Sequence, residues 1–592
     1  MRSFYLSITT ILILALVSSC AGSRHLISSG ELKEHIKYLS SDALKGRLTG
    51  TAGDSLAAEY IRSELREYGL RPLGDNGFQR FKVTDKVFAG SLNNLLINGK
   101  KYNHGTDFEP ASFSENGSLS STVIFGGYGF TINSDSLKWD DYKGQEFKGK
   151  WIMILRGDPE PDNSRSRYAS FSGDRDKAMV AKDLGAGGVL LVSGSNFDKE
   201  DKFDPLSKND YSVGIPVIRI KRKVADEILQ GTNSSIESLE TRLNTSKAPA
   251  SFAVPANIEA KAELVASKTN TRNVIMILPG TDSLLKKEYV IVGAHFDHLG
   301  MGGPGSGSRA VDTIGIHHGA DDNASGVSMV IELAGKFAAT RNSHKRSIVF
   351  CAFTGEELGL LGSKYFTDNP PVPLNRTDAM VNLDMVGRLK DNKELSVGGV
   401  GTAAGLKEMV SAGADTNLLK VVTSDEGSGP SDHSSFYSRN IPVLFITTGA
   451  HADYHTPSDT WDKINFRGMV TVSDFVYRLI FNLSNDTARL RFREAGPRES
   501  SSRNYRRKGV TLGIMPDVTG ASKNGLRVDA VTPGRPAALG GMKKNDIIVA
   551  INGKPVNNIQ DYMFRMGQLK HGERITVDVI RNGRKEVLII EL

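Results

Sequence analysis

The sequence predicts an α/β fold for its largest part: a mostly parallel, doubly wound sheet with helices on both faces. Between residues 253 and 485, short apolar runs alternate with helical patterns, which is typical of parallel strands joined by helices. Polar side chains follow the ends of these runs, as expected of an open α/β sheet that binds its ligand there. The expected strands are residues 273–278, 289–294, 347–353, 379–384 and 442–447, and the clearest amphipathic helix covers 324–339.

The composition fits a folded chain of several domains. The chain has 592 residues, of which 39% are hydrophobic and 24% charged, so a disordered or collagen-like protein is excluded. Its two cysteines exclude a disulfide scaffold, and Cys351 lies in an apolar run where a buried, reduced thiol is expected. The net charge of +7 hints at nucleic-acid or membrane-surface binding, but seven arginines between residues 489 and 507 account for much of it. We therefore expect no nucleic-acid partner.

The N-terminal residues 1–20 have the pattern of a secretory signal peptide. An apolar stretch follows Met1-Arg2, is too short to span a bilayer comfortably, and ends in small residues before Cys20. Residues 17–20 resemble a bacterial lipobox, in which the cysteine becomes the lipidated first residue of the mature protein. We expect export to the periplasm or outer membrane with a lipid anchor at Cys20. Ordinary cleavage near Ser19 without a lipid is the alternative.

Two further regions precede the predicted sheet. Residues 28 to about 84 have a helical pattern that the turn at 69–72 ends, and residues 94–108 are rich in short strands and turns. A compact α+β insert follows at residues 115–250, where apolar strands stand on either side of a helical segment.

A linker and a small β-rich domain follow the predicted sheet. Residues 486–508 contain almost no apolar side chain, and we interpret them as a basic, solvated linker rather than an arm that binds a polyanion. Residues 509–592 combine short strands, one helix and turn-forming glycines.

The polar side chains at the strand ends, and at the start of the helix over residues 324–339, are of the types that bind divalent metals. Singly, each is more often a surface histidine, a helix cap or a first-turn carboxylate. Together they form a nitrogen and oxygen ligand set in which one carboxylate can bridge two ions. Since no cysteine accompanies them, a hydrolytic centre with two metal ions is expected rather than a structural thiolate site. The ligand-capable residues are His295, Asp297 and His298, Asp321 and Asp322, Glu356 and Glu357, Asp384, and His451 and His455.

These motifs resemble those of the co-catalytic di-zinc aminopeptidases of metallopeptidase family twenty-eight. The resemblance covers about residues 30–110 and 253–485, so that residues 28–110 would be the N-terminal part of the peptidase domain. It implies a zinc exopeptidase fold and two Zn²⁺ per chain. The motifs are AHFDH (294–298), GADDNASG (319–326), TGEELGLLGS (354–363), NLDMVGR (382–388), SDHSSF (431–436) and YHTPSDT (454–460).

The resemblance implies the metal ligands residue by residue. His295 and Asp384 would bind one zinc ion, and Glu357 and His455 would bind the other. Asp322 would bridge the two ions, because it holds the family's position relative to the following glycine.

The same resemblance implies two catalytic roles. Glu356 would be the general base that takes a proton from the attacking water and passes it to the leaving amine. Asp297 would orient His295, as the partner of a metal-bound imidazole does. The remaining histidines of these segments receive no ligand role; they are His298, His317, His318 and His433.

The flanking segments resemble known modules as well. The insert 115–250 is similar to a protease-associated domain, which covers the cleft of such peptidases without being catalytic. Residues 509–592 resemble a PDZ domain, in which Leu512, Gly513 and Ile514 would form the loop that binds the carboxylate of a peptide. We expect this domain to bind free peptide C-termini without taking part in catalysis. A β domain that only packs against the core is the alternative.

The resemblance thus implies an exported metallo-aminopeptidase that hydrolyses the N-terminal bond of peptides. A carboxypeptidase of the same fold would need arginines to hold carboxylates, and Arg388 is the only arginine beside a metal motif. A single-zinc glutaminyl cyclase of the same fold is a second alternative. A non-catalytic peptide-binding scaffold is the third, but such a protein would have lost ligands or the base.

Overall fold

The computed structural model describes residues 25–592 apart from 135, 164, 209, 341–342, 496–509 and 518–524. The predicted signal peptide, with Cys20, and most of the predicted linker lie outside the described residues. Within the described residues, no helix is both long and apolar enough to cross a membrane.

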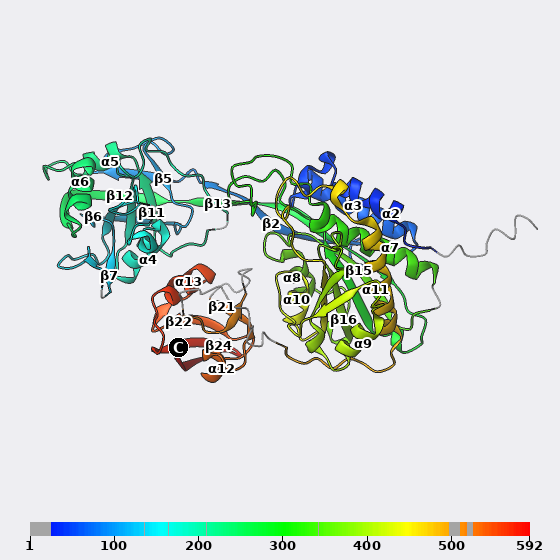
Figure 1. Cartoon of the computed structure of the whole chain (residues 1–592). Helices are drawn as coiled ribbons and strands as arrows, with labels where there is room; N and C mark the ends of the chain where they lie inside the picture. Colours follow the sequence, from blue (N-terminus) through cyan, green and yellow to red (C-terminus); the bar gives the residue numbers. More distant parts are fainter. Residues whose placement is uncertain are drawn as a thin grey trace, which may run out of the picture. The chain divides into compact units, whose positions relative to one another are not determined.

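The chain divides into two compact units (Figure 1). The first comprises Met1–Val83, Asn270–Ala521 and Arg527–Asp546. The second comprises Thr84–Thr269, Ser522–Leu526 and Ile547–Leu592. The C-terminal domain therefore contributes segments to both units.

The first unit is built on a mixed sheet with a parallel centre. Strands β15 (Ser347–Phe353), β14 (Tyr289–His295), β16 (Thr377–Leu383) and β19 (Val443–Thr447) lie in that order and run parallel. This centre contains four of the five expected strands and confirms the predicted α/β class. At one edge, β13 (Leu264–Leu278) runs antiparallel to β15 and pairs with β1 (Arg71–Pro72) and β2 (Phe78–Ala89). At the other edge, β17 (Glu394–Gly398) runs antiparallel to β19 and pairs with β18 (Lys420–Thr423).

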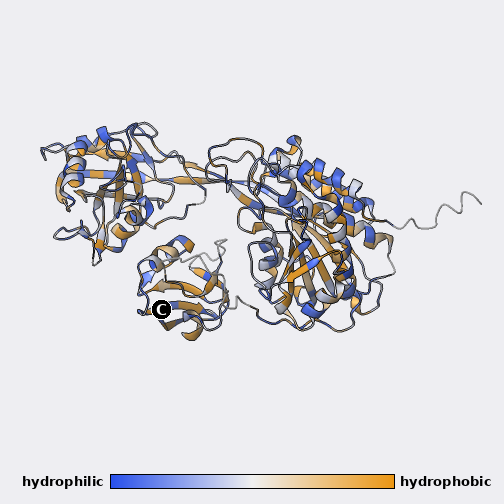
Figure 2. Cartoon of the chain, viewed as in Figure 1, coloured by the Kyte–Doolittle hydropathy of each residue, from blue (hydrophilic) through white to orange (hydrophobic). Residues whose placement is uncertain are grey.

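Alternate side chains of the central strands enter two separate cores. In β15, Ile348, Phe350 and Ala352 belong to one apolar cluster, whereas Val349, Cys351 and Phe353 belong to another. Because side chains of a strand alternate between faces, the sheet is covered on both faces, and all seven residues of β15 are buried. Cys351 is a free, buried thiol, as predicted. In Figure 2 the central strands are mostly orange, whereas the covering helices are striped orange and blue.

Different sets of helices cover the two faces of the central sheet. The first cluster takes in α2 (Ser29–Leu39), α3 (Ala52–Glu67), α7 (Gly326–Ala339), α9 (Leu406–Gly413) and α11 (Phe466–Asn485). The second takes in Phe366 of α8 (Leu361–Asp368) and Phe436 of α10 (His433–Tyr437). The expected helix over residues 324–339 corresponds to α7.

The N-terminal segment is helical over a shorter range than predicted. After α2 and the 3₁₀ segment η2 (Asp42–Arg47), α3 ends at Glu67, and Gly69 takes a left-handed φ of +77°. The chain then forms β1 and β2, which both pair with β13. The predicted end of the helix at the turn 69–72 is therefore confirmed. Residues 78–84, which the helical pattern included, instead lie in a strand, because pairing with distant β13 decides their conformation.

The second unit contains an eight-stranded sheet. Its strand order is β4 (Lys100–Lys101), β3 (Asn94–Ile97), β12 (Phe252–Ala262), β6 (Gly117–Phe125), β9 (Trp151–Leu155), β10 (Gly188–Val192), β11 (Val217–Ile220) and β5 (Phe108–Pro110). Helices α4 (Asp174–Asp183), α5 (Arg222–Ile228) and α6 (Ile236–Ser246) pack on it. The insert is α+β as expected, but β3 to β5 join its sheet. Residues 94–110, which were assigned to the peptidase domain, therefore belong to the insert.

The C-terminal domain is rich in short strands. In the first unit, β20 (Ile514–Pro516) pairs antiparallel with β21 (Leu526–Val531), and the helix α12 (Pro536–Leu539) follows. In the second unit, β22 (Ile547–Ile551) pairs with β23 (Lys554–Pro555) and β24 (Arg574–Arg581), β24 pairs with β25 (Arg584–Glu591), and α13 (Ile559–Gly567) lies between β23 and β24 in the sequence.

Candidate active site

The parallel register brings the C-terminal ends of neighbouring strands to one edge of the central sheet. His295 is the last residue of β14 and pairs with Phe353 at the end of β15. Asp384 directly follows β16, and Glu356 and Glu357 follow β15 after a turn at Gly355, where φ is +72°. His455 comes from the loop after β19. Residues that are far apart in the sequence are thus placed at a common edge.

Asp322 reaches the same site from the turn before α7. The turn is a short π-helical segment, Ala320–Ser325, whose backbone is non-helical at Asp322 and Asn323, and the peptide bond between them is cis. The carboxylate of Asp459 accepts hydrogen bonds from the backbone N–H groups of Asp321 (2.9 Å) and Asp322 (3.0 Å). These two bonds hold the turn that carries Asp322.

The two carboxylate oxygens of Asp322 face two different groups of side chains. Oδ1 lies 3.2 Å from His295 Nε2, which is itself 3.5 Å from Asp384 Oδ1. Oδ2 lies 3.1 Å from His455 Nε2, which is 3.3 Å from Glu357 Oε2. The structure therefore brings all five predicted ligands together, with Asp322 between the two pairs.

Asp321, the alternative to Asp322, is turned away from this arrangement. Its Oδ1 accepts a hydrogen bond of 2.6 Å from the backbone N–H of Gly387, and its Oδ2 lies 3.2 Å from His451 Nε2. Asp321 thus connects the turn to two other loops, while the side chain of Asp322 faces the candidate ligands.

The site concentrates negative charge in a buried space. Burial by itself lowers the pKa of His455, but the carboxylates of Asp322 and Glu357 raise it to about 10. The pKa of His295 responds in the same way: burial lowers it, but the carboxylates of Glu356 and Asp384 raise it well above the usual range. The carboxylates therefore outweigh the available positive charge, and bound cations would compensate the excess.

Glu356 differs from its neighbour Glu357 in its surroundings. Glu357 lies among the histidines, whereas burial, followed by nearby carboxylates, raises the pKa of Glu356 well above the usual range. Its backbone N–H donates a hydrogen bond of 3.0 Å to Asp297 Oδ1, which fixes the start of this segment. Adjacent residues in the sequence are thus given two distinct positions.

Asp297 is fully buried behind His295. Its Oδ2 accepts a hydrogen bond of 2.8 Å from the Thr49 hydroxyl, and its Oδ1 lies 3.8 Å from His295 Nδ1. The backbone carbonyl of Asp297 is closer to that nitrogen, at 3.3 Å. Burial raises the pKa of Asp297 to about 7. Asp297 therefore faces His295 with both its carboxylate and its carbonyl.

His298 was assigned no ligand role, yet the structure places it at the site. Its Nδ1 lies 2.8 Å from Glu357 Oε1 and 3.8 Å from Asp322 Oδ2, and the side chain is fully buried. The spacing of His295 and His298 in the AHFDH motif was the signal that could have indicated this contact. His298 orients the oxygen of Glu357 that does not face His455.

The other three histidines without a predicted role lie around the site without joining the ligand groups. His317 Nε2 lies 2.7 Å from the Ser308 hydroxyl, and His318 Nε2 lies 2.9 Å from Asp42 Oδ1. His433 is buried and stacks on Phe445 with ring centroids 4.5 Å apart, and burial lowers its pKa to about 3. A neutral, structural role fits this environment.

Two arginines support the loops of the site, the buried Arg47 and the partly buried Arg388, and the sequence singled out neither as a structural residue. Arg47 of η2 donates hydrogen bonds to the carbonyls of Phe296 (2.7 Å) and Gly319 (2.9 Å), and so joins the loop after β14 to the turn that carries Asp322. Arg388 lies 3.0 Å from Asp459 Oδ1. No local pattern indicates this role of Arg47, because the carbonyls of Phe296 and Gly319 lie more than 240 residues away in the sequence.

The side chains fit a pair of divalent cations. Each oxygen of Asp322 faces a histidine nitrogen and a second carboxylate, which is a three-ligand group of the nitrogen and oxygen donors that zinc accepts. The candidate atoms of His295, Asp322 and Asp384 all lie within 4.8 Å of one another. The excess of negative charge that the carboxylates bring to the site also agrees with two bound cations.

Comparison with known protein families decides the identity of the catalytic region. Residues 273–480 match the profile of "Peptidase family M28", and residues 510–592 match a PDZ domain. This chain carries a peptidase family M28 domain. The M28 match covers the central strands and the ligand positions from His295 to His455.

Several relatives of the M28 domain carry names that describe an activity. "Aminopeptidase YwaD" of Bacillus subtilis (strain 168) is 26% identical over 455 residues, which is 74% of this chain and 82% of that protein. A "Probable leucine aminopeptidase" of Trichophyton verrucosum is 30% identical over 223 residues, 36% of this chain and 55% of that protein. The solved structure of "BSAP, a zinc aminopeptidase from Bacillus subtilis" is 23% identical and has a TM-score of 0.45. The match covers 78% of this chain and 97% of that chain.

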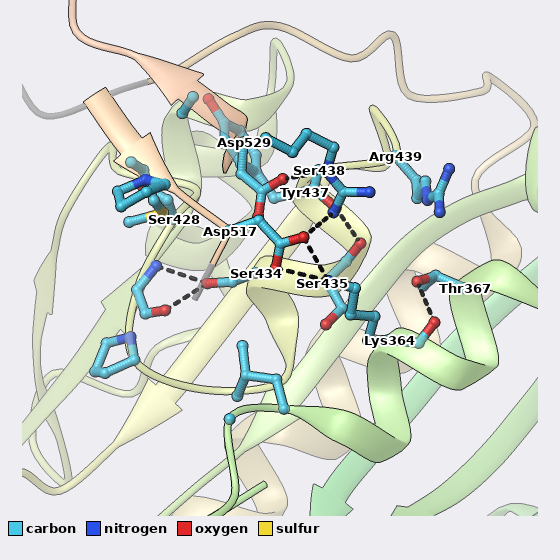
Figure 3. A pocket seen from close by; sticks show the side chains of 18 of the residues that line it. Lys364, Thr367, Ser428, Ser434, Ser435, Tyr437, Ser438, Arg439, Asp517 and Asp529 are labelled. Atoms are coloured by element: carbon cyan, nitrogen blue, oxygen red, sulfur yellow. Dashed lines mark hydrogen bonds and ion pairs between the residues drawn. The ribbon is translucent and has the colours of Figure 1, made fainter. Parts of the chain in front are cut away.

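A cavity of about 560 Å³ adjoins the M28 site (Figure 3). Glu356, Glu357 and Tyr454 line it, and so do residues of β20 and β21 from the C-terminal domain. The first two strands of this domain therefore line the same cavity as the candidate base. That the domain takes no part in catalysis stays a prediction.

The predicted carboxylate-binding loop of the PDZ domain precedes β20. Leu512 is fully buried, and its carbonyl accepts a hydrogen bond of 2.9 Å from Ala537 N–H. Gly513 has a φ of +73°, and a Cβ there would lie 2.2 Å from Cβ of Arg535, so only glycine fits. Ile514 begins β20 and pairs with Val531.

Proposed function

We propose that the chain is a zinc-dependent aminopeptidase that binds two zinc ions and hydrolyses the N-terminal peptide bond of peptides. The observation that carries the proposal is the position of Asp322, whose two oxygens each face a separate pair of candidate ligands. The names of the relatives that resemble the M28 domain support the same activity.

In this proposal, His295, Asp322 and Asp384 hold one ion, and His455, Asp322 and Glu357 hold the other. When bound, zinc lowers the pKa of water and polarises a carbonyl, which supplies the nucleophile and the electrophile of peptide hydrolysis at neutral pH. His298 keeps Glu357 in place through Oε1, the oxygen that does not face His455, and Asp297 keeps His295 in place through Nδ1, the ring nitrogen that does not face Asp322.

Glu356 acts as the general base. Its side chain lines the cavity beside Glu357 and, among the described residues, forms no ion pair with His295 or His455, so its carboxylate is available to a substrate. It would accept a proton from the attacking water at a carboxylate oxygen and donate that proton to the nitrogen of the leaving amine. The charge of bound cations would lower its pKa from the raised value that burial imposes.

The alternatives are less well supported by the geometry. A carboxypeptidase needs a free arginine for the substrate carboxylate, but Arg388 is engaged with Asp459 and lies 3.3 Å from Asp453 Oδ2. A single-zinc cyclase would not need two ligand groups around Asp322. A non-catalytic scaffold does not explain why the five candidate ligands and Glu356 converge.

We further propose that the protein is exported to the periplasm or outer membrane and that Cys20 carries a lipid anchor. We also propose that the insert is a protease-associated domain. These proposals are based on the sequence patterns of residues 1–20 and 115–250. The PDZ domain would bind the C-termini of peptides through residues 512–514, whose left-handed glycine shapes the loop.

Two measurements on the purified full-length chain test the proposed activity. Metal analysis should find two zinc ions per chain, and L-leucyl-p-nitroanilide should be hydrolysed, whereas its N-acetylated form should not. Dialysis against a chelator should abolish turnover, and added zinc should restore it. A preference for the N-blocked substrate, or turnover that survives removal of metal, would contradict the proposal.

A further inference from the structure

The cavity at the M28 site has walls from two domains. Glu356, Glu357 and Tyr454 line it together with residues 514–517 of β20 and its continuation. Further lining residues come from α8, α10 and the loop at 428–430. A substrate that reaches Glu356 therefore enters a space that the C-terminal domain helps to enclose.

A buried ion pair attaches β20 to the peptidase domain. Lys364 Nζ of α8 donates hydrogen bonds of 2.6 and 2.7 Å to the two oxygens of Asp517, as Figure 3 shows. Asp517 is 3% exposed and Lys364 is 9% exposed. Two charges that are buried together keep their partners in place, because separating them would leave each one desolvated without compensation.

Apolar packing and a second lysine reinforce this attachment. Ala530 belongs to the apolar cluster that contains Phe436 and Tyr437 of α10, and the partly buried Met515 packs against that cluster. Lys544 Nζ donates hydrogen bonds to the carbonyl of Tyr437 (2.8 Å) and to Asn440 Oδ1 (2.7 Å). The wall that β20 and β21 provide is thus part of a continuous core.

Outside the candidate metal site, the charged side chains that line the cavity are paired with one another. Arg527 lies 2.9 Å from Asp529 and 3.4 Å from Asp517, and Arg439 forms an ion pair with Asp368. Apart from six serine and threonine residues, the uncharged lining includes a group of apolar and aromatic side chains. They are Leu360, Tyr437, Tyr454, Ile514, Met515 and Pro516.

We propose that β20 is a substrate-selecting wall of the active site, and that Met515 contacts an uncharged, apolar part of a bound peptide. The proposal rests on the proposed function in that it takes the cavity to hold the peptide substrate. It deepens that function by naming the substrate class, peptides that are uncharged beside the residue being released, and by giving the C-terminal domain a part in their recognition.

The test measures peptide binding, so that it does not depend on turnover. In the Glu356→Gln background, calorimetry would compare Leu-Ala-Leu-Ala-amide with Leu-Glu-Leu-Glu-amide. We expect the uncharged peptide to bind at least roughly tenfold more tightly, since a carboxylate would have to be desolvated against paired charges. Met515→Trp, which adds volume to the wall, should weaken binding of the uncharged peptide by roughly tenfold or more.

A matched control and a second variant complete the test. Met563→Trp makes the same substitution at a 54% exposed position of α13 that does not line this cavity, and binding should stay within about twofold. If Met515→Trp does not fold, Met515→Ala decides, because losing apolar contact should weaken binding by roughly three- to tenfold. Equal affinities for the two peptides, no binding at all, or a Met515 variant that behaves like Met563→Trp would overturn the proposal. Hydrolysis of L-leucyl-p-nitroanilide by the unmodified chain judges the proposed function separately.

Discussion

Glu356 and Glu357 are adjacent carboxylates, and the proposed mechanism gives them different tasks that a matched pair of substitutions can separate. Each is replaced by glutamine, which keeps the size of the side chain but cannot accept a proton as a base or bind a metal as an anion. Glu408, an exposed glutamate of α9, provides the same substitution away from the cavity as a control.

For Glu356→Gln, the expected loss is catalytic. The backbone of residue 356 is held by Asp297, and within the part of the chain that the structure describes its side chain forms no ion pair with the candidate ligands, so the fold and both ions should be retained. The turnover number should fall by the ~10²- to 10⁴-fold that a general base contributes. At about 1.4 kcal/mol per tenfold change, this corresponds to roughly 3 to 5 kcal/mol of lost transition-state stabilisation.

For Glu357→Gln, the expected loss is in metal binding. The two oxygens of Glu357 face imidazole nitrogens of His298 at 2.8 Å and His455 at 3.3 Å, so an amide NH₂ would replace one acceptor by a donor. Loss of a hydrogen-bond partner behind a ligand typically costs 10- to 100-fold in metal affinity, and loss of the ligand's own charge should cost at least about that much.

Metal analysis after dialysis, together with turnover of L-leucyl-p-nitroanilide, distinguishes the two outcomes. The Glu356 variant should keep two ions and lose turnover, the Glu357 variant should lose about one ion, and Glu408→Gln should match the unmodified chain. If both substitutions at 356 and 357 remove metal equally, or if Glu356→Gln remains fully active, the assignment of the two roles is refuted.

Three further predictions concern other parts of the chain. Cys20→Ser should move the protein from the membrane to the soluble fraction; unchanged fractionation and no acyl group on the unmodified chain by mass spectrometry would exclude the lipid anchor. Gly326→Ala should lower metal affinity and destabilise the fold by about 1–3 kcal/mol, because its Cβ would lie 2.4 Å from Asn323 Oδ1 and 2.5 Å from the Leu383 carbonyl. Isothermal titration with zinc measures the first effect and thermal unfolding the second. As a control, Gly567→Ala should change neither, since no atom lies within 4 Å of the new Cβ. Burial raises the pKa of Asp141 in the insert from 3.8 to about 7, so between these pH values the folded state binds a proton that the unfolded state has released. The free energy of unfolding should therefore fall as pH rises from about 4 to about 7. Asp141→Asn should flatten this dependence in calorimetric unfolding, and an unchanged slope would contradict the prediction.

The sequence by itself determined the parallel centre of the sheet and the set of candidate ligands. The apolar runs at 289–294 and 347–353 are long enough and apolar enough to be buried on both faces, and the structure has β14 and β15 there. Because parallel strands end at one edge, the polar residues that follow them had to converge, and His295, Glu357, Asp384 and His455 do so.

The tertiary structure alone decided which groups support those ligands and what encloses them. Residues 78–89 became a strand through pairing with β13, and residues 94–110 joined the insert, since strand pairing depends on distant partners. Arg47, Thr49 and Asp459 reach the site through contacts that no local pattern encodes. The place of Met515 in the cavity wall likewise depends on packing across domains, since local sequence patterns report the conformation of a segment but not the surface against which it folds.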